Sequence, residues 1–119
     1  MSNDPVTTVR RYDEERADED DESRLMILSE IWANEGLYID PDIPDGIRGP
    51  AALASFIGQS FEEFPGLAIT ATTDVTVLGD RACYRWTATA NDGQSFSGTD
   101  FVEFAHDGRT ARVTNFYDE

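Results

Sequence analysis

Two aspartates occupy positions where a carboxyl group could take part in proton transfer. Asp40 lies in the stretch LYIDPDIPDGIRG, residues 37–49, where strand-forming residues meet a turn rich in proline and glycine. Asp100 lies in SGTDFVEF, where apolar and polar residues alternate. A carboxylate beside a pocket can take a proton from a bound molecule, and one in an apolar site can hold a proton and donate it. Both residues are therefore candidates for acid–base chemistry.

Asp40 also has a simpler interpretation. An aspartate that precedes a turn commonly accepts hydrogen bonds from the backbone of the next residues, and Pro41 follows it directly. The sequence thus leaves two roles open for Asp40, a general base at the mouth of a pocket and an Asx-type turn former.

Asp100 stands out because of side-chain alternation in the C-terminal half. One parity of the expected strands is apolar, and its members are Ile69, Ala71, Val75, Val77, Tyr84, Trp86, Ala88, Phe96, Val102, Phe104, Val113 and Tyr117. Asp100 and Asn115 fall on this parity. A buried carboxylate is unfavourable unless it is paired or protonated, so we expect either a functional acid or a hydrogen-bonded structural carboxylate. A β-bulge that shifts the register would instead turn Asp100 outward.

Three helices are expected in the N-terminal half to position these residues. Asp4-Pro5 is typical of a helix start, with an N-cap followed by proline at the first helical position. A second helix is expected from Glu22 or Ser23 to Gly36, with Trp32 on its inner face. After a short strand and turn in residues 37–49, Pro50 begins a third helix that Pro65-Gly66 ends.

The C-terminal half predicts an antiparallel meander. Turn signals separate four expected strands, which are Leu67–Leu78, Arg81–Ala90, Gln94–Ala105 and Thr110–Tyr117. Helices followed by a meander predict an α+β domain spanning residues 1–119, with the helices on the apolar face of the sheet. The opposite parity is rich in threonine and includes Thr110, so this outer face suits solvent or a second copy of the sheet.

The charge of the chain excludes several classes of partner. Nine basic and twenty-four acidic residues give a formal net charge of −15, and every basic residue is arginine. Such a surface repels phosphate backbones and anionic lipid headgroups, so we expect neither nucleic-acid nor membrane partners. Abundant acid without lysine also favours adaptation to high salt, where the repulsion between carboxylates is screened.

The remaining bulk features indicate a cytoplasmic protein without a metal. Cys83 is the single cysteine, so no disulfide can form within the chain, and no apolar run approaches the ~20 residues of a membrane helix. With one cysteine and one histidine, His106, a zinc site is not expected. The acidic run in residues 13–22 is expected to be a solvated connection rather than a cation site.

The order of these motifs resembles the NTF2-like superfamily, and most closely its SnoaL-like and ketosteroid-isomerase-like branch. The likeness covers nearly the whole chain and rests on LYIDPD, GIRGPAALASFI, FPGL and SGTDFVEFAHDGRTARVTNFYDE. It implies a cone in which a strongly curved sheet and three helices enclose an apolar cavity open at one end. The fold hosts isomerases, cyclases, epoxide hydrolases and binders that catalyse nothing, so it alone does not assign a reaction.

The resemblance to ketosteroid isomerases implies roles for three residues. Tyr12 of VRRYDEE matches a tyrosine that donates a hydrogen bond to the substrate oxygen. Asp40 of YIDPD matches the general base, and Asp100 of GTDFVEF matches a protonated acid that donates to the same oxygen. The cavity wall expected from this match comprises Tyr38, Phe56, Trp86, Val102, Val113, Asn115 and Tyr117.

Three hypotheses of function follow. The first is a proton-transfer enzyme, such as an isomerase, that needs no cofactor and acts on a small apolar or partly polar organic ligand. The second is a SnoaL-like cyclase or epoxide hydrolase with other acid–base roles in the same cavity. The third is a binder that catalyses nothing, or a module that forms a homodimer through the outer sheet face.

Overall fold

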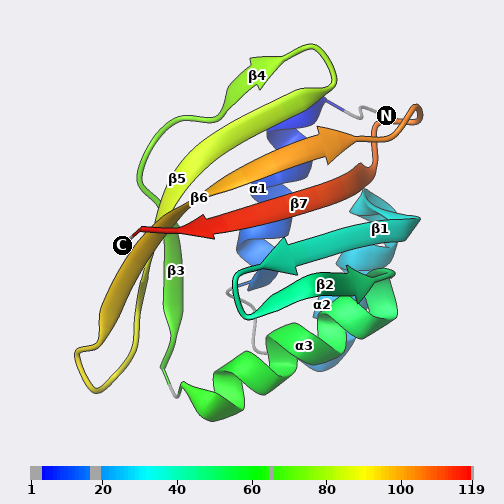
Figure 1. Ribbon diagram of the computed structural model, residues 1–119. Coiled ribbons are helices and arrows are strands. Elements are labelled where there is room, and N and C mark those ends of the chain that lie inside the picture. Colours follow the sequence, from blue (N-terminus) through cyan, green and yellow to red (C-terminus); the bar gives the residue numbers. More distant parts are fainter. Residues whose placement is uncertain (1–3, 17–19, 65, 119) are drawn as a thin grey trace.

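The structure is a computed structural model, which describes residues 4–16, 20–64 and 66–118 (Figure 1). The chain begins with two helices, α1 (Pro5–Arg16) and α2 (Asp21–Ile31), which are followed by the hairpin β1 (Trp32–Asp40) and β2 (Ile43–Arg48). Helix α3 (Pro50–Glu63) comes next. The remaining strands are β3 (Ala68–Ala71), β4 (Thr76–Leu78), β5 (Arg81–Thr89), β6 (Ser95–Phe104) and β7 (Thr110–Tyr117).

A strongly curved sheet forms one side of the molecule, and the helices cover its inner face (Figure 1). The strand order is β2-β1-β7-β6-β5-β3, and β4 also pairs with β5. The expected three helices on a curved sheet are confirmed. The sheet is mixed rather than antiparallel, however, because β1 runs parallel to β7 in the middle of the sheet. The chain reaches this parallel pairing through α3 and the meander, the kind of long crossover that parallel strands require.

The alternation predicted for the central strands is confirmed. In β5 the buried residues are Ala82, Tyr84, Trp86 and Ala88, and the residues between them face outward. Asp100 and Asn115 are both buried on this inner face. Thr110 departs from the prediction, since it is buried although its parity placed it outside. A register shift between Glu103 and Phe104, opposite the start of β7, accounts for the change.

Element boundaries differ from the prediction in the first half of the chain. Helix α2 ends at Ile31, and Trp32 already has the extended backbone of β1. Gly36 therefore ends no helix; it lies within β1, where an added Cβ would come within 2.4 Å of the Trp32 indole nitrogen. The expected turn in residues 37–49 contains the strand β2, whose place at the sheet edge tolerates Pro44.

Two further segments also differ from the prediction. The expected strand Leu67–Leu78 divides into β3 and β4, which pair with different parts of β5. Part of the acidic run is helical, because α1 extends to Arg16 and Asp20 caps the first turn of α2 by accepting from the Glu22 backbone N–H. Residues 17–19 of that run lie outside the described residues.

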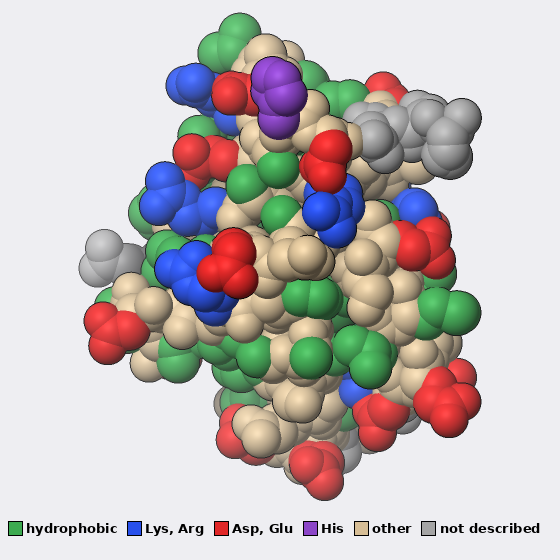
Figure 2. All heavy atoms as spheres, turned by 90° about the vertical axis from the view of Figure 1, so that its right-hand side faces the viewer, with side chains coloured by type: hydrophobic (Ala, Val, Ile, Leu, Met, Phe, Trp, Pro, Cys, Tyr) green, Lys and Arg blue, Asp and Glu red, His purple; other side chains and the backbone are tan. Residues whose placement is uncertain are grey.

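The surface is acidic, with arginines set beside many of the acids. Figure 2 shows this for the face that carries His106. Arg112 forms an ion pair with Glu103 at 2.9 Å, and Arg109 forms one with Asp107 at 2.9 Å. In the described ranges no helix is long and apolar enough to cross a membrane.

Candidate active site in the cavity

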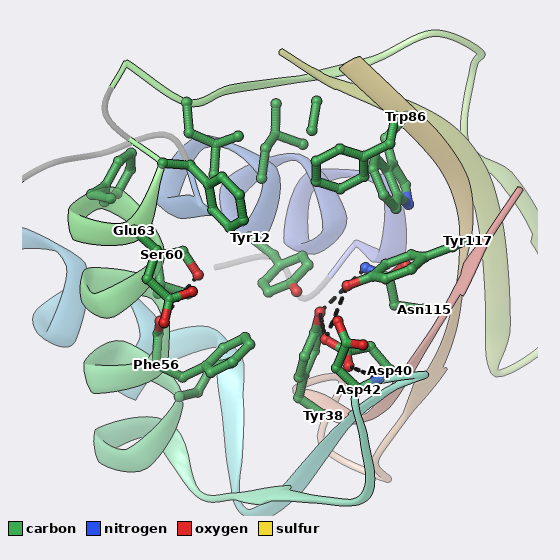
Figure 3. Close-up of a pocket in the computed structure, with 18 residues that line it drawn as sticks. Tyr12, Tyr38, Asp40, Asp42, Phe56, Ser60, Glu63, Trp86, Asn115 and Tyr117 are labelled. Atoms are coloured by element: carbon green, nitrogen blue, oxygen red, sulfur yellow. Dashed lines mark hydrogen bonds between the residues drawn. The ribbon is translucent and has the colours of Figure 1, made fainter. Parts of the chain in front are cut away.

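A cavity of about 220 Å³ lies between α3 and the inner face of the sheet. Figure 3 shows Phe56, Ser60 and Glu63 of α3 on one side, with Asp40 and Tyr117 opposite. Helix α1 contributes Tyr12, which stands between the two walls. The volume is below the ~300–1,000 Å³ of pockets for drug-sized ligands, so the cavity suits a molecule built on a single ring.

The expected cavity wall agrees in large part with the observed lining. Tyr38, Phe56, Trp86, Asn115 and Tyr117 all line the cavity. Val102 and Val113 are not among its described lining residues and lie fully within the hydrophobic core. These two valines lie opposite each other in the pairing of β6 with β7.

Asp40 lies at the end of β1 with its carboxylate at the cavity wall. The residue is 3% exposed, and Oδ1 accepts hydrogen bonds from the backbone N–H groups of Asp42 at 2.8 Å and Ile43 at 3.1 Å. Oδ2 accepts hydrogen bonds from the hydroxyl groups of Tyr38 at 3.0 Å and Tyr117 at 3.4 Å. One oxygen thus forms the Asx turn of the β1–β2 hairpin, and the other faces the tyrosines that line the cavity.

Asn115 extends this network by one more residue. Its Nδ2 group donates to the Tyr38 hydroxyl oxygen at 3.3 Å. The Tyr38 proton is directed to Asp40, so the hydroxyl oxygen can only accept from Asn115, and this fixes the orientation of the amide. The inward polar residue noticed in the sequence therefore orients Tyr38 against Asp40.

Tyr12 shares the cavity with Asp40. Its side chain is buried, and its ring packs on Trp32 with a centroid separation of 5.4 Å. Figure 3 shows its hydroxyl pointing toward the group formed by Tyr38, Asp40 and Tyr117. The structure therefore brings together two of the three residues that the isomerase resemblance singles out.

Asp100 is fully buried but is not among the described residues that line the cavity. Its Oδ1 accepts from the Trp86 indole N–H at 3.1 Å, and its Oδ2 lies 2.9 Å from the Tyr84 hydroxyl. The Trp86 ring lines the cavity, so the hydrogen bond that Asp100 accepts from its indole N–H helps to fix this part of the cavity wall.

The Tyr84 hydroxyl also lies 2.9 Å from Oδ1 of Asp13 on α1. A hydroxyl group has one proton, so it can donate to one carboxylate at a time. The arrangement ties α1 to the sheet beside Tyr12.

Three polar residues of the lining were not among the predicted site residues. Asp42 lies within the turn that Asp40 forms, and Ser60 and Glu63 lie on α3. Phe56, Ser60 and Glu63 are spaced by four and then three residues, which places them on one face of a helix. This spacing is visible in the sequence, but it does not distinguish a wall of a cavity from a wall of a packed core.

The curved sheet, the three helices and the cavity between them define an NTF2-like protein, a class also described as having a cystatin-like fold. The SnoaL-like domain model matches residues 9–113. The chain belongs to the SnoaL-like family.

Solved structures of similar proteins agree with this assignment. A proposed isomerase of the SnoaL-like family from Agrobacterium tumefaciens is 26% identical, with a TM-score of 0.87 and coverage of 100% of both chains. A protein with a cystatin-like fold from Methylobium petroleophilum is 19% identical, with a TM-score of 0.81, over 100% of this chain and 79% of the other. A proposed ketosteroid isomerase from Kribbella flavida is 24% identical, with a TM-score of 0.75, over 97% and 78%. The comparison with curated proteins found no match.

Proposed function

We propose that the chain binds a small carbonyl compound in the cavity and transfers a proton within it, without a cofactor. The observation that carries this proposal is the shared cavity of Asp40 and Tyr12, a buried carboxylate and a phenol hydroxyl. The similarity to a proposed isomerase of the same family, at 26% identity over the full chain, supports the same class of reaction.

In the proposed reaction Asp40 acts as the base. Its Oδ2 takes a proton from the carbon next to the carbonyl, the C–H electron pair forms a carbon–carbon double bond, and the carbonyl π electrons move to oxygen. Tyr12 donates a hydrogen bond to that oxygen, where negative charge develops. In a substrate that also carries a double bond between its β and γ carbons, Asp40 then returns the proton to the γ carbon. The electrons of that double bond form the new C–H bond, the electrons of the enolate double bond move to between the α and β carbons, and the carbonyl group re-forms, which completes the isomerisation.

Asp100 is a positioning residue in this proposal. Its two oxygens contact Trp86 and Tyr84, so its role is to hold the Trp86 ring in the cavity wall and not to donate to the substrate. This assignment differs from the one implied by the resemblance to ketosteroid isomerases.

Hydrogen–deuterium exchange at carbon tests the proposal without knowledge of the natural substrate. Small cyclic ketones are incubated with the protein in D₂O, and deuterium next to the carbonyl is followed by NMR. We expect Asp40→Asn to slow exchange by about 10²–10⁴-fold, because the base is lost while Oδ1 can still accept the two backbone N–H groups. Tyr12→Phe should slow it by about 10²–10³-fold.

Asp45→Asn is the matched control. Asp45 is an exposed acid on the same hairpin and does not line the cavity, so this variant loses the same charge and should retain the wild-type rate. Equal exchange by wild type and Asp40→Asn across the ketone panel would contradict the proposal.

A second candidate function is ligand binding without catalysis. It is favoured by the four hydrogen bonds that Asp40 accepts, which include the two that form the hairpin turn. Binding of ketones or phenols by the wild-type protein, with no exchange above the uncatalysed rate, would select this candidate.

The proposal extends to assembly, in which a second copy packs on the outer face of β5, β6 and β7. This face carries Phe116, which is 57% exposed, and the ion pairs of Arg85 with Asp118 and Arg112 with Glu103. Its charges are locally balanced on a chain of net charge −15, so two copies repel each other least here. Phe116→Asp should convert a dimer to a monomer in light scattering; a monomeric wild type would contradict the proposal.

A further inference from the structure

The hydroxyl protons around the cavity are largely directed into the protein. Tyr38 and Tyr117 both donate to Asp40 Oδ2, and Ser60 Oγ donates to the Phe56 carbonyl at 3.2 Å. The Trp86 N–H donates to Asp100 at 3.1 Å. Each of the three hydroxyl groups has a single proton, so they offer a ligand only their oxygen lone pairs. Their hydrogen bonds to a ligand therefore require a ligand that donates.

The charge of the lining also favours a ligand that donates hydrogen bonds. Asp40, Asp42 and Glu63 are acidic, and none of the described lining residues is basic. Asp42 and Glu63 are exposed and lie on opposite walls, one on the β1–β2 hairpin and the other at the end of α3 (Figure 3). An anionic ligand would meet three carboxylates without a cation to balance its charge, which is strongly unfavourable in a partly buried site.

Aromatic rings supply much of the apolar surface of the cavity. Eight of the eighteen described lining residues are aromatic. Trp86, Phe96 and Tyr117 pack on one another edge to face, with centroid separations between 5.8 and 6.0 Å. The negative face of an aromatic ring attracts a cation, and the ring also packs well against an apolar body.

We propose that the cavity selects a small protonated amine: an ammonium group with N–H donors on a body of about one ring. The ammonium group donates to oxygen atoms of the polar lining, Asp42 and Glu63 attract it by their negative charge from the two walls, and the apolar body packs on the aromatic rings. This inference rests on the proposed use of the cavity as a small-molecule site and not on catalysis there. If proton transfer does occur, the substrate class becomes an amine-bearing carbonyl compound.

Three probes of the same shape test the selectivity. Benzylamine, benzyl alcohol and benzoate differ in the charge and donors of one substituent, and binding to the full chain is measured by NMR titration at pH 7. We expect benzylamine to bind at least about tenfold more tightly than benzyl alcohol, and benzoate to produce no saturable shift. Equal binding of amine and alcohol, or saturable binding of benzoate, overturns the proposal.

Paired variants separate the cavity from the general attraction of a chain with net charge −15. The double variant Asp42→Asn with Glu63→Gln removes the two exposed acids of the lining. Its control, Asp45→Asn with Glu62→Gln, removes two exposed acids from the same hairpin and helix outside this cavity. We expect the first to weaken benzylamine binding about tenfold and the second to change it less than twofold; equal weakening by both overturns the proposal.

The two proposals fail separately. Amine selectivity without deuterium exchange in ketones contradicts proton transfer and leaves the ligand class intact. Deuterium exchange in ketones, together with equal binding of benzylamine and benzyl alcohol, contradicts the proposed ligand class and leaves the proposed proton transfer intact.

Discussion

Asp40 and Asp100 are both buried, and both accept hydrogen bonds from aromatic side chains, yet they lie in regions of different character. Asp40 lines the cavity and shares its oxygens between a hairpin turn and two tyrosine hydroxyls. Asp100 lies behind the cavity wall, where its oxygens meet Trp86 and Tyr84. Burial alone therefore does not separate a residue that can react from one that supports its surroundings; access to the cavity does.

The strand that carries Asp100 is closely packed at Gly98. Gly98 lies opposite Trp86 in the β5–β6 register, two residues before Asp100 on the same face. A Cβ at this glycine would lie 2.2 Å from the Phe116 carbonyl oxygen and 2.6 Å from Trp86 Cζ2. The glycine of the GTDF motif thus leaves room for the indole ring, whose N–H donates to Asp100.

Gly98→Ala should have the largest effect on stability. The nearest atom to the added methyl group is a backbone oxygen of the neighbouring strand, which cannot move without distorting the sheet. We expect a loss of about 3 kcal/mol in the free energy of unfolding, measured in urea. Gly79→Ala is the contrasting control: its Cβ meets nothing within 4 Å, but its φ of 60° makes alanine unfavourable by about 1 kcal/mol. Equal losses would show that packing at Gly98 is looser than the geometry indicates.

Substitution of Asp40 and Asp100 by alanine should have the next largest effects on stability, and the two effects should differ. Asp100→Ala leaves the Trp86 N–H without its acceptor in a buried site, which should reduce the free energy of unfolding by about 2–3 kcal/mol. Asp40→Ala removes the acceptor of two backbone N–H groups in a partly exposed hairpin and of the Tyr38 and Tyr117 hydroxyls beside the cavity, where water can replace the carboxylate, so about 1–2 kcal/mol is expected. Urea unfolding of both variants measures the difference. A larger loss at Asp40 would reverse the comparison.

Much of the Asp100 region could be predicted from sequence because it depends on local rules. Strand alternation placed Asp100 and Asn115 on the inner face, and the Asn91-Asp92-Gly93 turn signal fixed the β5–β6 pairing. Whether Asp100 reaches the cavity could not be predicted. That depends on where the ring of Trp86 lies, a tertiary contact between two strands that leaves no periodic signal.

The Asp40 region was harder to predict for a related reason. The Asp-Pro turn favoured both a turn former and a base; in the structure Oδ1 forms the turn, and Oδ2 accepts from the Tyr38 hydroxyl at the cavity wall. The edge strand β2 was missed because Pro44 and Gly46 suggest a turn, although an edge strand tolerates both. The parallel pairing of β1 with β7 joins residues about 75 positions apart, and no local rule reports it.

The two tyrosines that donate to Asp40 should contribute unequally to stability. Tyr38 donates to Asp40 at 3.0 Å and accepts from Asn115, whereas Tyr117 donates at 3.4 Å from a partly exposed position. We expect Tyr38→Phe to reduce the free energy of unfolding by about 1–2 kcal/mol, because it removes two buried hydrogen bonds. Tyr117→Phe should cost less than about 0.5 kcal/mol. The same urea titration measures both, and equal effects would argue against a distinct role for Tyr38.

Asp107 is an exposed carboxylate that can be compared with the buried Asp40 and Asp100, and its substitution should have the smallest effect on stability. The Arg109 backbone N–H at 3.0 Å and the Arg109 guanidinium at 2.9 Å hold the pKa of Asp107 below its usual value. Because the folded-state pKa is the lower one, the stabilisation is complete above the unfolded pKa of ~3.9 and is lost as the pH falls through the folded value.

The melting temperatures of wild type and Asp107→Asn should therefore differ by a small, constant amount between about pH 5 and 7, and converge below about pH 4. The difference is small because water and salt screen an ion pair at the protein surface. Melting curves collected across this range measure it. A difference that grows on acidification would show that Asp107 destabilises the fold when it is charged, the opposite of what its contacts with Arg109 predict.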